Sequence, residues 1–171
     1  MEEEKTLAKQ AASDTYDASD KPFDFVEAGA QTAIICESDP AVREKIGSAM
    51  KNLGYLVTDA ANAKEALKFM RFHVFNIVIL NETFDADNPA LNSVLEYLAH
   101  LNMSTRRQIF VALISSQYRT SDNMAAFNKS VNLIINTSNI DDIGTIMTRS
   151  VAENMAFYHI FSETLKKTGR V

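Results

Sequence analysis

Asn81 is the residue that first raises the question of chemistry in this sequence. It follows the apolar run Asn76–Leu80, and side chains at the open end of such a buried strand are commonly functional. Glu37 follows a second apolar run, Thr32–Cys36. A carboxylate can hold a cation or attack an electrophile, whereas the amide of Asn81 has no anionic oxygen and carries no charge. The amide therefore argues against nucleophilic chemistry at this position.

The remaining reactive residue types form no catalytic or metal-binding pattern. The three histidines, His73, His100 and His159, lack the spacing of metal ligands, and the five glycines are too scattered for a phosphate-binding loop. Cys36 is the only cysteine, so an internal disulfide or a zinc cluster cannot form. Because Cys36 lies in an apolar run with no base beside it, we expect a buried structural thiol. We expect no cofactor and no metal.

Apolar runs alternate with amphipathic segments along the chain. Continuous apolar runs indicate strands covered on both faces, and apolar positions three or four residues apart indicate helices. This alternation is typical of an α/β fold, a doubly wound, five-stranded parallel sheet with helices on both faces. The expected strands are Thr32–Cys36, Tyr55–Ala60, Asn76–Leu80, Ile109–Ser115 and Asn132–Ile135. The expected helices lie at about Pro40–Leu53, Asn62–His73, Ala90–Leu101, Ser121–Ser130 and Ile140–Lys167.

The expected strand order is flavodoxin-like, 2-1-3-4-5. In such sheets a ligand binds beyond the carboxyl ends of the strands, where the strand order reverses. The first and third strands are neighbours at that point. We therefore expect Cys36–Asp39 and Asn81–Thr83 to face each other across one crevice.

Over about residues 31–150, the pattern resembles the receiver domain of bacterial two-component response regulators. Receivers carry an acidic pair after strand one, a phospho-accepting Asp after strand three, a Ser or Thr after strand four and a Lys after strand five. Here IICESDP is similar to the first segment, NIVILNETF to the second, VALISS to the third and NLIINTSNIDDI to the fourth. The resemblance assigns these positions to Glu37 and Ser38, to Asn81, to Ser115 (with Ser116 as a one-residue alternative) and to Asn136, and the aromatic switch position to Leu133.

The departures from the receiver pattern remove the chemistry that the resemblance would imply. Receivers need a carboxylate nucleophile, a divalent metal held by carboxylates, and a lysine. Ser38 and Asn81 replace two acids and Asn136 replaces the lysine, which leaves Glu37, with Asp39 nearby. We predict a pseudo-receiver that is not phosphorylated, in which Ser38, Asn81 and Asn136 satisfy one another through neutral hydrogen bonds. The degenerate phosphorylation site comprises Glu37, Ser38, Asn81, Ser115 and Asn136.

Three functions stay open at this point. The first is a stand-alone, non-enzymatic signalling or scaffold module that acts by protein–protein interaction, since no output domain follows before Val171. The second is a receiver-like sensor that binds a small anion or a nucleotide in the crevice. The third is phosphoryl acceptance by Glu82 or Asp85. A metal site rebuilt from Asp85 and Asp87 is a further alternative.

The net charge of −5 is concentrated at the start of the chain. Residues 1–30 hold eight acids and three lysines, so the remainder is balanced. We expect a flexible acidic leader over residues 1–21 and an extended lead-in over residues 22–30. The charge argues against a nucleic-acid partner, and no apolar stretch has the length of a membrane span. Without a signal peptide, a cytoplasmic setting is expected.

The last predicted helix is longer than the sheet can cover. Apolar residues keep helical spacing through residues 151–171, the expected helical C-terminal extension. Phe157, Tyr158 and Phe161 form an aromatic cluster there, the kind that interface cores favour. This cluster could bind a protein partner, form a homodimer or pack on the lead-in PFDFV of its own chain.

Two adjacent arginines, Arg106 and Arg107, precede the fourth strand. They could be solvated, bond loop acids, or contact an acidic surface such as the leader.

Overall fold

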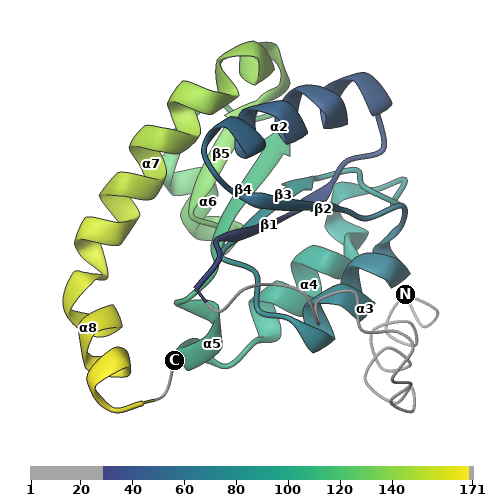
Figure 1. Cartoon of the computed structure of the whole chain (residues 1–171). Coiled ribbons are helices and arrows are strands. Elements are labelled where there is room, and N and C mark those ends of the chain that lie inside the picture. Colours follow the sequence, from purple (N-terminus) through teal and green to yellow (C-terminus); the bar gives the residue numbers. More distant parts are fainter. Residues whose placement is uncertain (1–28, 170–171) are drawn as a thin grey trace.

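The computed structural model describes residues 29–169 (Figure 1). Our predictions of a flexible leader over residues 1–21 and of an extended lead-in up to residue 28 lie outside the described residues. The same is true of packing between the PFDFV segment and the aromatic cluster. The described part begins with Gly29, whose φ of 92° is one that glycine adopts without strain.

One parallel sheet organises the molecule, and its strand order is the predicted one, β2-β1-β3-β4-β5. Every residue of β1 and β4 is buried, and so are all but the last of β3. This burial explains why these strands read as continuous apolar runs. The strands are β1 (Thr32–Cys36), β2 (Leu56–Asp59), β3 (Ile77–Asn81), β4 (Phe110–Ser115) and β5 (Leu133–Asn136).

The register brings the polar strand ends to one edge of the sheet. Asn81 pairs with Ile114, and Ser115 pairs with Asn136. Because all the strands are parallel, the segment after β1 reaches the same edge. The segments predicted to line one crevice therefore lie at the carboxyl ends of the central strands.

Helices cover both faces of the sheet (Figure 1). On one face, α2 and α7 bury Ile46, Met50, Ile143 and Met147 against the strands. On the other face, α3, α4 and α6 close a second apolar cluster that includes Phe84. The helices are α2 (Pro40–Asn52), α3 (Ala63–Phe72), α4 (Ser93–His100), α5 (Met103–Arg106), α6 (Asn123–Asn128), α7 (Ile143–Phe157) and α8 (His159–Lys167), with 3₁₀ segments η2 (Pro89–Leu91) and η3 (Thr137–Asp142).

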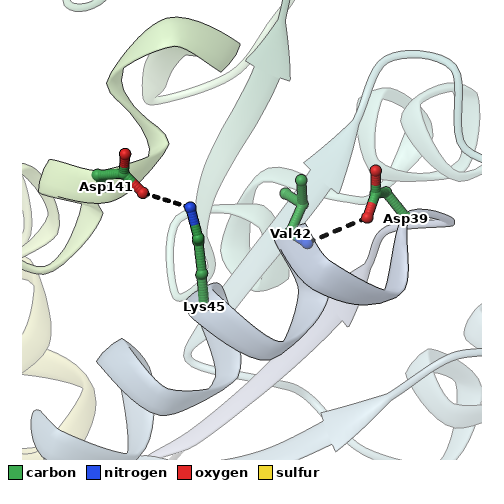
Figure 2. Close-up of polar contacts among 4 residues, drawn as sticks. All are labelled: Asp39, Val42, Lys45 and Asp141. Atoms are coloured by element: carbon green, nitrogen blue, oxygen red, sulfur yellow. Dashed lines mark hydrogen bonds and ion pairs between the residues drawn. The ribbon is translucent and has the colours of Figure 1, made fainter.

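The start of α2 follows the signals in its sequence. Asp39 is the N-cap residue, and its carboxylate accepts hydrogen bonds from the backbone N–H groups of Ala41 at 2.8 Å and Val42 at 3.2 Å. Lys45, farther along α2, forms an ion pair with Asp141 of η3 (Figure 2). This pair is exposed and contributes at most about 1 kcal/mol. The capping role of Asp39 engages Oδ1 of the carboxylate that the sequence analysis placed near Glu37.

The C-terminal helical region is divided, where we expected a single helix over about Ile140–Lys167. The segment Thr137–Asp142 is a 3₁₀ helix, and a break at Tyr158 (φ −93°, ψ 11°) separates α7 from α8. Helical structure still reaches Lys167. The expectation of one long helix is wrong. The helical spacing of apolar residues continues through Tyr158, although the backbone leaves the helix there, so the sequence does not reveal the break.

The break at Tyr158 allows α8 to turn back toward α5 (Figure 1). The guanidinium of Arg107, at the end of α5, lies 5.6 Å from the centre of the Phe161 ring. This cation–π contact joins the extension to the start of β4. Within residues 29–169, no helix combines the length and apolar character needed to cross a membrane.

Candidate functional site

Glu37 and Asn81 meet at the ends of β1 and β3, as the predicted strand order requires. The Asn81 side-chain Nδ2 donates to Glu37 Oε2 at 2.7 Å. The other carboxylate oxygen, Oε1, accepts from the backbone N–H of Asp39 at 2.9 Å. Glu37 is only 3% exposed. Both of its oxygens are thus occupied by protein donors, which stabilises a buried carboxylate without a metal.

The remaining capacity of the Asn81 amide is also used. Its Oδ1 accepts from both the backbone N–H and the hydroxyl of Thr83, each at 3.0 Å. This turn closes the start of the β3–α4 loop. The amide is therefore held in one orientation, with its NH₂ group toward Glu37. Neither of its atoms can act as a nucleophile toward phosphorus.

Glu82 is a second buried carboxylate, next to Asn81 in the chain but with different partners. It is 3% exposed, and its Oε1 accepts from the hydroxyl of Ser115 at 2.8 Å and from the backbone N–H of Ser116 at 3.1 Å. Its Oε2 is buried and has no hydrogen-bond partner in the described part of the chain. A phosphodonor in solvent cannot reach this oxygen in the present conformation, which argues against Glu82 as an acceptor.

Asn136, to which the resemblance assigns the place of the receiver lysine, is hydrogen-bonded to partners other than Asn81. Its Nδ2 donates to the carbonyl of Tyr118 at 2.7 Å, and its Oδ1 accepts from the N–H and hydroxyl of Ser138. Ser38 is exposed. The prediction that Ser38, Asn81 and Asn136 satisfy one another is therefore wrong. Each amide is satisfied by its own neighbours, so the polar edge is divided into two hydrogen-bond groups.

A cation, Arg43, contacts the same edge of the sheet as the two buried carboxylates. The guanidinium of Arg43 on α2 donates to the backbone carbonyl of Glu37 at 3.2 Å. Sequence reasoning did not anticipate Arg43, although its place one turn into a helix after Glu37 could have suggested it. A small anion entering this edge would meet the buried carboxylates of Glu37 and Glu82, which disfavour it.

No cluster of three or more His, Cys, Asp or Glu side chains that could hold a metal occurs in residues 29–169. Asp85, a candidate replacement ligand, uses Oδ2 to accept from the backbone N–H of Ala63 at 2.9 Å. Cys36 is fully buried, and burial raises the pKa of its thiol. The prediction of a structural thiol is confirmed, because a protonated thiol is neither a ligand nor a nucleophile.

Asn92 is a site residue that sequence reasoning missed. Its Nδ2 donates to the backbone carbonyls of Asn81 at 3.2 Å and Glu82 at 3.1 Å, and its Oδ1 caps α4. The capping role was readable from an Asn just before an amphipathic segment. The hydrogen bonds from Asn92 to the end of β3 join residues about ten positions apart in the chain. Such contacts leave no recognisable motif in the sequence.

The aromatic cluster at the end of α7 is formed as predicted. The ring centre of Tyr158 lies 4.9 Å from that of Phe157 and 6.1 Å from that of Phe161, both in edge-to-face contacts. Phe161 and Tyr158 are half-buried, whereas Phe157 is 80% exposed. The cluster therefore packs partly within the chain and presents one phenyl ring to solvent.

Arg106 has a structural role that was not among the three alternatives considered for the arginine pair. Its guanidinium donates to the carbonyls of Ile109 and Ser130, each at 2.8 Å, and to Asn132 Oδ1 at 3.1 Å. The Asn132 Nδ2 in turn donates to Asn154 Oδ1 of α7 at 3.2 Å. These bonds tie the starts of β4 and β5 to α7.

A groove of about 550 Å³ lies between the N-terminal end of α6, the start of β5 and α7. Arg149, Glu153 and Phe157 line it on α7, and Ser121 and Asn123 line it at α6. The helices α6, α7 and α8 also expose large apolar side chains. These are Met124 (69%), Phe127 (78%), Met155 (65%), Phe157 (80%) and Ile160 (74%).

Solved structures reveal which known fold this is. The CheY4 chemotaxis response regulator of Vibrio cholerae superimposes with a TM-score of 0.57 at 13% identity, over 71% of this chain and 98% of that one. The receiver domain of the Francisella response regulator 1452 gives 0.57 at 15% identity, over 72% and 98%. This chain has the receiver fold.

A third receiver widens the comparison. A CheY-like receiver domain protein from Methanospirillum hungatei matches with a TM-score of 0.54 at 16% identity, over 74% of this chain and 98% of that one. No protein-family model matches the chain, and no curated protein matches it. With identities this low the likeness establishes the receiver fold, while the chemistry of the crevice rests on the residues described above.

Proposed function

We propose that this chain is a non-enzymatic, receiver-like signalling or scaffold module of a bacterial two-component pathway, working in the cytoplasm. It acts by protein–protein interaction and is not phosphorylated. The receiver fold supports a signalling role. The observation that carries the rest is the hydrogen bond from the Asn81 amide to Glu37. At the position of the phospho-acceptor, a neutral amide donates to a carboxylate oxygen that a metal would need.

The loss of switching chemistry is supported at three positions of the phosphorylation site. Asn81 cannot accept a phosphoryl group, both Glu37 oxygens are engaged, and Asn136 is committed to the β4–α6 loop. The three substituted positions, Ser38, Asn81 and Asn136, would have to change for phosphoryl transfer to return. A module with these substitutions would keep the surface of a receiver and lose its dependence on a kinase.

The surface most suited to a protein partner is the interaction face, defined as α6, β5, α7 and α8. It carries the groove and the exposed apolar side chains, and its Arg149 and Glu153 form a surface ion pair beside exposed Phe157. An apolar centre with a charged border is the usual anatomy of a protein interface. Nucleic acid and membrane are not part of this proposal.

Incubation with acetyl phosphate and Mg²⁺, followed by intact-mass measurement, tests the proposal. We expect no added phosphoryl group on this chain, while a receiver with an intact Asp and Lys gains one under the same conditions. A phosphorylated fraction above that of the heat-denatured chain would overturn the proposal. Peptide mapping would then distinguish Glu82 from Asp85, the alternative acceptors.

A further inference from the structure

Glu82 has an unusual environment for a charged residue. The carboxylate is buried, and one of its two oxygens has no partner in the described part of the chain. Burial of a carboxylate is unfavourable unless its hydrogen bonds offset the lost hydration. The two donors to Oε1, the Ser115 hydroxyl and the Ser116 N–H, are thus the interactions that hold it there.

The backbone of Glu82 is fixed independently of its side chain. Its N–H donates to the carbonyl of Ile114 at 3.0 Å, and its own carbonyl accepts from Asn92 Nδ2 at 3.1 Å. The carboxylate therefore projects from a rigid strand end. Such a group can position a neighbouring loop, because it does not move with that loop.

The loop that Glu82 contacts is the β4–α6 loop, residues 116–122. Ser115 Oγ donates to Glu82 and accepts from the backbone N–H groups of Gln117 at 3.0 Å and Tyr118 at 3.4 Å. The Tyr118 carbonyl accepts from Asn136 at the end of β5. The loop is held from β3 on one side and from β5 on the other.

This hydrogen-bond relay leads directly to the interaction face. The backbone N–H of Asn136 donates to the Thr120 hydroxyl at 2.9 Å, and the Ser121 N–H donates to the Ile134 carbonyl at 2.9 Å. Ser121 has a positive φ of 61°, which the surrounding bonds must maintain. Ser121 and Asn123, just beyond the relay, line the groove.

We propose that Glu82 is a built-in anionic anchor that fixes the β4–α6 loop, and with it the α6 side of the groove, in one conformation. It is a positioning residue, since it acts through Ser115 and the loop. The link to partner binding rests on the proposed function, whereas the anchoring of the loop does not. An internal carboxylate makes the loop conformation permanent in a chain that cannot be switched by phosphorylation.

Hydrogen exchange of the full chain, resolved to single amides by NMR, tests the anchor directly. In Glu82→Ala, we expect exchange at Ser116, Gln117 and Tyr118 to rise about tenfold or more relative to amides of β1, because a charge-assisted bond and its relay are lost. Glu82→Gln keeps a neutral acceptor and should give a smaller rise. Ser115→Ala should raise exchange at Gln117 and Tyr118 more than at Ser116.

Asp85→Asn is the matched control, because it removes a carboxylate from the same β3–α4 loop but from a bond to Ala63. It should leave exchange in the β4–α6 loop unchanged. Equal exchange in wild type and Glu82→Ala after normalisation to β1, or an equal rise in the control, would overturn the anchor. Should Glu82→Ala not fold, the Glu82→Gln and Ser115→Ala variants decide. The readout needs no partner or phosphodonor, so its failure is separable from failure of the proposed function.

Discussion

The Asn81 Nδ2 and Glu37 Oε2 atoms are 2.7 Å apart. At this distance the contact is attractive or repulsive depending on whether the atom of residue 81 is nitrogen or oxygen. With nitrogen the contact is a charge-assisted hydrogen bond. With oxygen it would be a contact between two carboxylates, one of them buried. The crevice thus remains stable without the metal or the lysine that a carboxylate cluster would require.

Asn81→Asp tests this account of the crevice at the residue scale. We expect the free energy of unfolding at pH 7 to fall by about 1–3 kcal/mol, because a favourable bond becomes a like-charge contact. Mg²⁺ should recover part of the loss in the variant and none in wild type. Denaturant titrations with and without Mg²⁺ measure each effect.

Asn88→Asp is the control for that experiment. Asn88 Oδ1 accepts from the backbone N–H of Ala90 at 2.9 Å, a role that aspartate fills equally well. Its stability should stay within about 0.5 kcal/mol of wild type. If Asn81→Asp were as stable as this control at neutral pH, repulsion from Glu37 would not be the reason for the amide.

At the scale of the elements, the strands were the part most open to prediction. Strands such as Thr32–Cys36 are covered on both faces, and their sequences are therefore continuous apolar runs. Because of this, their ends are predicted within about one residue. The expected order of the parallel strands then predicted that Glu37 and Asn81 lie close together. This meeting of Glu37 and Asn81 was predictable because it follows from topology and not from side-chain detail.

Other features had no local signal. The short helix α5 spans Met103–Arg106, too few residues for a periodic pattern. The break at Tyr158 interrupts an apolar spacing that itself continues. The burial of Glu82 depends on Ser115, 33 residues away, and a charged residue in a polar stretch is ordinarily exposed. Tertiary contacts decide such cases, and a single sequence does not show them.

Phe161 and Phe157 of the aromatic cluster should differ in their contribution to the free energy of unfolding. Phe161 is half-buried against Tyr158 and Arg107, so Phe161→Ala should lower the free energy of unfolding by about 1–2 kcal/mol. Phe157 is 80% exposed, so Phe157→Ala should change it by less than about 0.5 kcal/mol. Chemical denaturation of the two variants measures the difference. Equal stability of both would mean that α8 does not depend on the Phe161 contacts.

At the scale of the whole molecule, apolar surface is unevenly distributed. The side chains of Phe127 and Phe157 are 78% and 80% exposed, on the two helices that border the groove. Exposed aromatic side chains beside a groove are typical of surfaces that another protein covers. The exposed ring of Phe157 is predicted to contribute little to stability, and we propose that a protein partner covers it. Under the proposed function, the interaction face would bind its partner without a phosphorylation step.

Self-association is the form of this binding that can be measured with the chain alone. We expect the mass from light scattering to rise from monomer toward dimer with concentration, since the face is available on every copy. Phe157→Asp should weaken this association by at least about tenfold, as loss of an aromatic anchor at an interface does. Met103→Asp is the matched control, because Met103 is 57% exposed on α5, outside the interaction face. A monomeric mass at every concentration, or equal weakening by both substitutions, would exclude a homodimer through this face and leave a different protein as its occupant.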